Sequence, residues 1–144
     1  MRDNYHSTKV AEAIAPAVLA ADNTPVAIDL LGFNSATLAL HVGVGGITFT
    51  GTNKIEFKLT HSVDGVTYDA VERSDVLGVD AVGAGGIIKA LIAAHPASAV
   101  YRIGYVGYRR YIKVLADFSG THGTGTPIAA TAILGNAQLR PVAA

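Results

Sequence analysis

The chain has 144 residues, a length that fits one domain with a hydrophobic core of its own. It contains no cysteine, which excludes disulfides and thiolate metal sites. The formal net charge is zero, which argues against general nucleic-acid binding, because such binding depends on positive charge that neutralises phosphates. Only 15% of the residues are charged, and a surface with so little repulsion indicates contact with partner subunits.

Residues 1–25 are predicted to form an extended N-terminal arm that lies on a neighbouring surface or on the body of the domain. A short helix over residues 10–19 is the alternative, and Pro16 would break it. The same stretch resembles a signal peptide only in outline, because Glu12 and Pro16 interrupt its apolar part. No run of about 20 apolar residues exists, so no membrane span is predicted. The candidate contact residues of the arm are its strong hydrophobes: Val10, Ile14, Val18 and Leu19.

From residue 26 onward, short apolar runs alternate with turns rich in glycine, aspartate and asparagine. The clearest predicted strand covers residues 54–62, and Asp64-Gly65 after it predicts a hairpin to a partner strand over residues 66–71. Strict alternation in the first of these strands predicts that one set of side chains points inward: Ile55, Phe57, Leu59 and His61. The remaining predicted strands cover residues 26–31, 36–42, 99–105, 111–118 and 127–134.

Two segments qualify this pattern. Residues 87–94 could form either a strand or a helix, and Gly135-Asn136 is expected to end the last strand. About seven or eight short strands separated by turns predict an all-β fold, an antiparallel β-sandwich or a jelly-roll-like barrel. The predicted organisation is an N-terminal arm at residues 1–25, a β-sandwich domain at residues 26–137 and a C-terminal tail at residues 138–144.

The sequence carries no recognisable catalytic or cofactor motif. No two of the five histidines have metal-site spacing, and no serine lies in a G-x-S-x-G elbow. The glycine-rich segments 43–46 and 83–86 lack the spacing of a phosphate-binding loop. A carboxylate pair assembled by folding stays open, although no tryptophan is present to stack a sugar. We therefore predict no enzyme, no cofactor, no metal ion and no small-molecule substrate.

The strongest local constellation lies in residues 101–113, which contain four tyrosines, three arginines and a lysine. Tyrosine and arginine are enriched at protein interfaces, whereas the same mixture also suits single-stranded nucleic acid. The tyrosines could instead pack across neighbouring strands. We prefer the interface interpretation, whose candidate residues are Tyr101, Arg102, Tyr105, Tyr108, Arg109, Arg110 and Tyr111.

The charges are unevenly distributed along the chain. Residues 100–144 contain five basic residues and one acidic residue, a balance of +4, so the remainder carries −4. A basic end and an acidic end would suit docking between subunits.

Residues 101–107 (YRIGYVG), followed by Arg110-Tyr111, resemble a signature of small proteins encoded among the head genes of tailed bacteriophages. Residues 27–30 (AIDL) with 32–36 (GFNSA), 61–68 (HSVDGVTY) and 123–135 (GTGTPIAATAILG) resemble the same family. The resemblance implies a virion structural protein on the capsid exterior, which decorates or cements the capsid. Its implied partners are the major capsid protein and neighbouring copies in a homo-oligomer, and it implies no catalytic residues. A phage tail or neck protein and a carbohydrate- or host-binding β-sandwich module are the alternatives.

Overall fold

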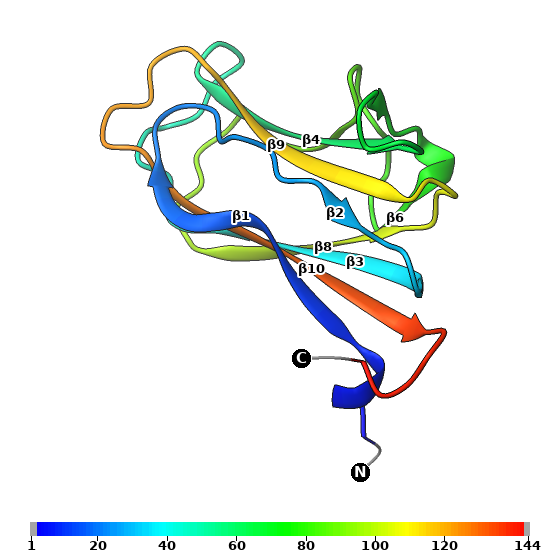
Figure 1. Cartoon of the computed structure of the whole chain (residues 1–144). Helices are drawn as coiled ribbons and strands as arrows, with labels where there is room; N and C mark the ends of the chain where they lie inside the picture. The colour runs from blue at the N-terminus through cyan, green and yellow to red at the C-terminus, as the bar shows by residue number, and fades with distance from the viewer. Residues whose placement is uncertain (1–2, 143–144) are drawn as a thin grey trace.

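The computed structural model describes residues 3–142, which form two antiparallel sheets that face each other without closing into a barrel. Sheet A is the lower layer in Figure 1 and sheet B is the upper layer. In spatial order, sheet A consists of β1 (Lys9–Leu19), β10 (Thr126–Ala137), β3 (Phe33–Val42), β8 (Ala99–Tyr105) and β6 (Val76–Leu77). Sheet B consists of β2 (Ile28–Asp29), β9 (Tyr111–Ser119), β4 (Lys54–Ser62) and β5 (Asp69–Ala70), and β7 (Ile87–Leu91) also pairs with β4. The predicted antiparallel sandwich is confirmed.

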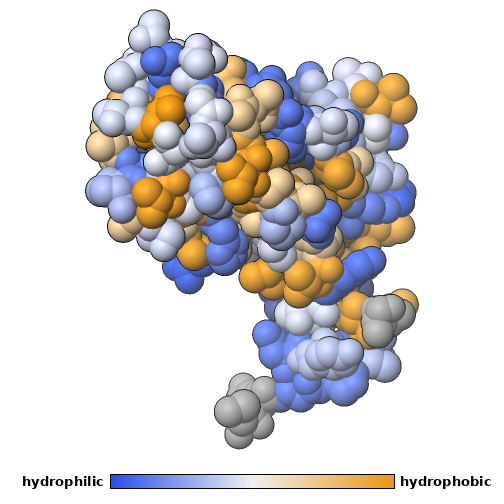
Figure 2. Space-filling view, turned by 90° about the vertical axis from the view of Figure 1, so that its left-hand side faces the viewer, coloured by the Kyte–Doolittle hydropathy of each residue, from blue (hydrophilic) through white to orange (hydrophobic). Residues whose placement is uncertain are grey.

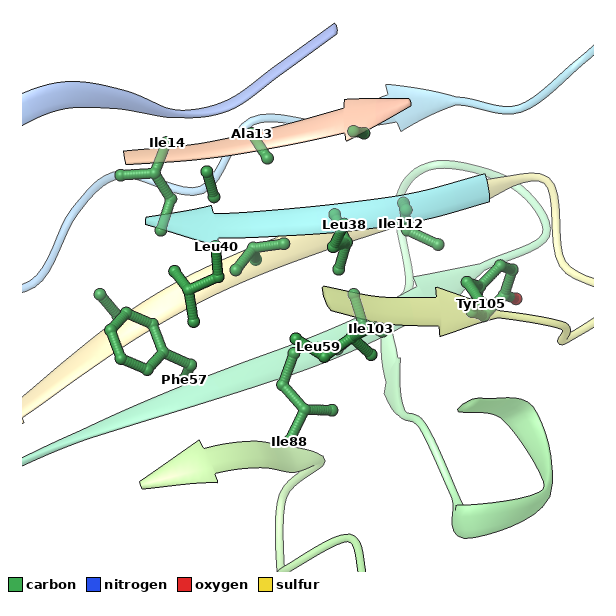
Figure 3. Close-up of a cluster of buried hydrophobic side chains, with 14 of the residues drawn as sticks. Ala13, Ile14, Leu38, Leu40, Phe57, Leu59, Ile88, Ile103, Tyr105 and Ile112 are labelled. Carbon is green, nitrogen blue, oxygen red and sulfur yellow. The ribbon is translucent and has the colours of Figure 1, made fainter. Parts of the chain in front are cut away.

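The core fills the space between the two sheets and follows the two-residue period of the strands. Strand β4 has the predicted bounds, and its inward set is buried as predicted. Figure 3 shows Leu38 and Leu40 of β3 close to Phe57 and Leu59 of β4. The inward set of β9 is buried too, except for Phe118, which is half-buried at the edge of the core. Alternation therefore predicts the core correctly wherever the strands are regular.

The segment predicted as an arm contributes an edge strand to the domain. Residues 9–19 form β1, which pairs antiparallel with β10 and is not a helix. The side chains of Ala13 and Ile14 are buried in the common core, with 0% and 3% of their surfaces exposed. This part of the chain therefore belongs to the sandwich rather than to a separate arm.

The short strand β2 leaves part of the edge of β9 without a strand partner. Residues 20–27, which cross from sheet A to sheet B, cover that part. The Asn23 side chain accepts a hydrogen bond from the Ala116 backbone N–H (2.7 Å) and donates one to the Val114 carbonyl (3.3 Å). A carboxylate oxygen of Asp22 accepts a third hydrogen bond from the Phe118 N–H (2.7 Å). These side chains replace the backbone partners that a longer β2 would supply.

Three strand predictions need correction. The partner strand expected over residues 66–71 pairs only at β5, because the Asp64 carboxylate accepts the N–H groups of Val66 and Thr67 and holds this stretch in a loop. The strand expected over residues 26–31 is only two residues long, as β2. Strand β10 runs past Gly135-Asn136 to Ala137, because β3 continues to pair with it there. The ambiguous segment at residues 87–94 is a strand, over Ile87–Leu91.

The remaining elements are short. Two 3-10 helices cover Tyr5–Ser7 and Arg73–Asp75, and the first of them lies near the C-terminal residues, below the sandwich in Figure 1. Within residues 3–142, no helix is long and apolar enough to cross a membrane.

Candidate functional site

A groove of about 480 Å³ opens at the end of the sandwich where two turns meet, at the right-hand end of Figure 1. One wall is the β2–β3 turn with the start of β3 (residues 30–36), and the other is the β8–β9 turn (residues 105–110). Gln138 completes the lining. The groove contains four of the predicted interface residues: Tyr105, Tyr108, Arg109 and Arg110. We call it the turn-end groove.

Tyr105 anchors the β8–β9 turn to the core. Its hydroxyl accepts a hydrogen bond from the Arg109 backbone N–H (3.2 Å) and lies 3.0 Å from Nδ1 of His61. The turn folds closely over this side chain, because a Cβ at Gly107 would lie 2.5 Å from the Tyr105 hydroxyl oxygen. Figure 3 shows Tyr105 at the margin of the buried cluster. The turn is thus held by one buried tyrosine, and the residues on either side of Gly107 are turned toward solvent.

The buried pair of His61 and Tyr105 is held uncharged at neutral pH. Burial lowers the pKa of His61, and the positive charge of Arg109 nearby adds to this shift. Burial also raises the pKa of Tyr105, so its hydroxyl keeps the proton. The neutral imidazole meets the Tyr105 ring edge to face, with the ring centroids 5.9 Å apart.

This pair predicts a pH dependence of stability. The unfolded histidine, with its ordinary pKa of 6.5, binds protons that the buried His61 binds poorly. The unfolded state therefore takes up more protons as the pH falls below about 6.5, and the free energy of unfolding decreases until the pH falls below the lowered pKa of the folded His61. Urea titrations at a series of pH values measure it, and His61→Gln should flatten the profile. His41→Gln retains His61 and should keep the slope; a flat wild-type profile contradicts the assignment.

Two ion pairs fix the arginines of the groove. Arg109 Nη1 pairs with the carboxylate of Asp69 on β5, and Arg110 binds Asp29 on β2 through Nε (2.8 Å) and Nη2 (2.6 Å). The Arg110 guanidinium holds the pKa of Asp29 below its ordinary value. Both arginines therefore meet acids from the negatively charged part of the chain. This pairing reduces the separation into a basic end and an acidic end that the sequence predicts.

Exposed apolar side chains surround the turn-end groove. Leu31 is 66% exposed, Val106 55% and Tyr108 86%, and all three line it. Leu139, next to the lining residue Gln138, is 85% exposed. Large apolar side chains that gather around a concave surface are typical of a site that a partner covers.

The other predicted interface residues of the tyrosine- and arginine-rich segment lie away from this groove. Tyr101 is half-buried, with its hydroxyl 3.1 Å from His95 Nε2, and Lys89 lies over its ring. Arg102 is exposed on the outer face of sheet A. Tyr111 is half-buried under the Arg110 guanidinium, which lies 4.9 Å from its ring centroid. The structure therefore brings together only part of the predicted set.

The predicted contact residues of the arm divide in the same way. Ile14 is in the core and Leu19 is half-buried against it, so neither offers a contact surface. Val10 and Val18 are exposed. Val18 lines a second, largely apolar groove of about 570 Å³ on sheet A, together with Val100 of β8 and Ala129 of β10.

Sequence reasoning missed Leu31, Val106 and Gln138. The sequence does not show that the β2–β3 turn faces the β8–β9 turn. Only the pairing of β3 with β8 brings the two turns to one end. Within residues 3–142, no group of three histidine, aspartate or glutamate side chains lies close enough to hold a metal ion.

The fold and the turn-end groove define an antiparallel β-sandwich with an apolar, arginine-containing groove at one end. In comparisons with known proteins, no family model, no curated protein and no solved structure matches the chain.

Proposed function

We propose that the chain is a virion structural protein of a tailed bacteriophage, which decorates or cements the capsid by binding major capsid protein subunits on the outer surface. It acts by binding rather than by catalysis and uses no cofactor. The observation that carries the proposal is the turn-end groove, where exposed apolar side chains surround two arginines held in fixed positions.

The chemistry of this groove suits a protein partner. Tyr108 offers a large amphipathic surface with only two side-chain torsions to order, which keeps the entropic cost of binding low. The ion pairs of Arg109 and Arg110 fix the arginines before binding, so a partner need not order them. Leu31 and Val106 add apolar surface beside them that a partner can remove from water.

The resemblance to phage head proteins also indicates that the turn-end groove is the contact site. Two of the segments that carry it, residues 32–36 and residues 101–107, are far apart in the sequence. Residues 32–36 line the turn-end groove, and so do the last three residues of the second segment. Arg110, which follows that segment in the resemblance, lies there as well.

The proposal is tested with capsids that lack the protein, prepared from the phage that encodes it, and with the purified full chain. We expect the wild-type chain to decorate the outer shell in many copies, visible by cryo-electron microscopy. Tyr108→Ala should weaken binding by about tenfold or more, because truncating a central interface aromatic commonly costs at least that much. Tyr5→Ala is the matched control, since Tyr5 is also exposed and does not line the groove.

Two results would contradict the proposal. One is density for the chain in rings at the neck or along the tail instead of on the shell. The other is shell binding by Tyr108→Ala that equals the binding of the wild-type chain.

A carbohydrate-binding or host-binding module is the second candidate, and one observation favours it. The exposed Tyr108 ring lies in the same groove as the amide side chains of Asn34 and Gln138, which hydrogen-bond to each other at 3.1 Å. Aromatic faces with amide groups nearby suit sugar hydroxyls. Selective binding on a glycan array that Tyr108→Ala abolishes would favour this module over capsid decoration.

A further inference from the structure

The outer face of sheet A is built from small and apolar side chains. In the long strands β10 and β3, alternate residues such as Ala132 and Leu38 are buried in the core, and the residues between them face solvent. Figure 2 shows hydrophobic surface along the lower margin of the body, the side on which sheet A lies in Figure 1, whereas the projection beneath it is largely hydrophilic. This face is distinct from the turn-end groove.

Only three charged residues occur in the four long strands of this sheet, β1, β10, β3 and β8, all of which the structure describes: Lys9, Glu12 and Arg102. Lys9 lies opposite Leu134, whose side chain points toward the core, so it does not share the outer face. Glu12 lies opposite Thr131, and Arg102 lies opposite Ala39, all on the outer face.

These pairings form one continuous row across the sheet, which reads Glu12–Thr131–Ala39–Arg102. The acid and the base stand at its two ends, three strand spacings or roughly 14 Å apart. At that distance they cannot pair within one copy, and neither makes an ion pair with any described residue. When such a row meets the same row of a second copy in reverse order, the acid of each copy lies opposite the base of the other.

The next row along the strands carries no charge. It reads Val10–Ile133–Thr37–Gly104–Leu77. Val10, Ile133 and Leu77 are exposed apolar side chains, and the Leu77 side chain leans over Gly104. Beyond the charged row, on its other side, lies the apolar groove of about 570 Å³ that contains Val18 and Val100. Mostly apolar surface therefore flanks the charged row on both sides, with the exposed His41 between Ala129 and Val100 on the groove side.

We infer that the outer face of sheet A binds the same face of a second copy of this chain, around a two-fold axis that runs along the strands between β10 and β3. The operation sets each row against itself in reverse order. Glu12 of each copy then faces Arg102 of the other, which makes two reciprocal ion pairs. Val10 faces Gly104 and the apolar Leu77 side chain that leans over it, and Ile133 faces Thr37.

The size of the face indicates a reversible dimer. Four strands overlap, because β6 has no counterpart beyond β1 when the order is reversed. At roughly 4.8 Å spacing and about seven residues at roughly 3.4 Å, they give an area on the order of 450 Å² per copy. The total of about 900 Å² is below the size of standard protein interfaces, so we expect a weak, transient dimer. This self-association goes beyond the proposed function and does not depend on whether a capsid is the partner.

The test uses charge exchange in the purified full chain, measured by sedimentation equilibrium without capsids. Glu12→Arg sets like charges opposite each other in the dimer, and so does Arg102→Glu. Each single variant should weaken dimerisation by at least about tenfold. The double variant exchanges both charges and should dimerise like the wild-type chain, and an equimolar mixture of the two single variants should form a heterodimer.

Lys113→Glu is the matched control, because it changes the net charge by the same amount as Arg102→Glu but lies on β9 of sheet B, and it should leave the dimer intact. Circular dichroism of each variant checks that the fold is retained, as expected for exposed side chains. A wild-type chain that stays monomeric at its highest soluble concentration overturns the inference. It is also overturned by single variants that dimerise normally, or by a mixture that stays monomeric.

Discussion

Deletion of residues 1–25 is expected to leave a chain that no longer folds, although the sequence marks this segment as an arm outside the domain. The deletion removes β1, and with it the buried side chains of Ala13 and Ile14. Loss of a buried isoleucine side chain alone costs about 2–5 kcal/mol, a large part of the 5–15 kcal/mol that holds a typical domain together. The backbone of β10 would also lose its β1 partner from Thr126 to Leu134 and become an exposed edge prone to aggregation.

Circular dichroism and size-exclusion chromatography measure this outcome directly. Deletion of residues 1–8 is the matched control, because it ends before β1 and removes mostly exposed side chains, so the remaining chain should melt cooperatively. If the chain that begins at residue 26 shows the native spectrum and a cooperative transition, β1 is dispensable and the segment behaves as the arm that the sequence indicates. Loss of capsid binding after the larger deletion is therefore informative only when the chain is shown to be folded.

The contrast between β4 and β1 shows which strands the sequence can identify. In β4, charged or hydroxyl side chains alternate strictly with buried ones from Lys54 to His61, and the strand has the predicted bounds. In β1, the pairing with β10 shifts between Glu12 and Ile14 and again before Ala17, so the neighbours Ala13 and Ile14 are both buried. Irregularities of this kind break the two-residue period, and Pro16 adds a residue that sheets tolerate mainly at edges and bulges. No local pattern in this stretch could therefore have predicted the strand.

Very short strands escape sequence reasoning for a different reason. Strands β2, β5 and β6 have two residues each, too few to show any period. Their pairing depends on neighbours from distant parts of the chain, as when β2 lies against the start of β9. The unpaired stretch of the β9 edge next to β2, to which Asn23 hydrogen-bonds, could not have been predicted without knowing that pairing.

The candidate site was predictable in composition but not in arrangement. Alternation along β8 separates Tyr101 and Tyr105, which point inward, from Arg102, which points outward, so one strand cannot present all three on one surface. Arg109 and Arg110 lie in and after the turn and meet acids from β5 and β2. Which acids they meet depends on the order of strands in sheet B, and residue types alone do not give that order.

Asn23→Ala is expected to lower the free energy of unfolding by about 2–6 kcal/mol, because it leaves two backbone groups of β9 without partners at about 1–3 kcal/mol each. The Asn23 side chain accepts from the Ala116 N–H and donates to the Val114 carbonyl, in the same way as a neighbouring strand. Ala116 is fully buried and both hydrogen bonds are partly buried, which limits their replacement by water. Urea denaturation of the purified chain measures the change.

Two further variants test whether the effect comes from the hydrogen bonds of Asn23 to β9 rather than from the loss of any asparagine. Asn23→Asp keeps the acceptor for the Ala116 N–H but sets a carboxylate oxygen against the Val114 carbonyl, so it should also be destabilising. Asn34→Ala removes an exposed asparagine that bonds only the Gln138 side chain, and it should change stability by no more than about 0.5 kcal/mol, as is usual for surface substitutions. Equal stabilities of Asn23→Ala and Asn34→Ala would mean that water satisfies the edge of β9 equally well. The crossing from sheet A to sheet B would then be held by the Asp22 hydrogen bond to Phe118 and by the pairing of β2 with β9.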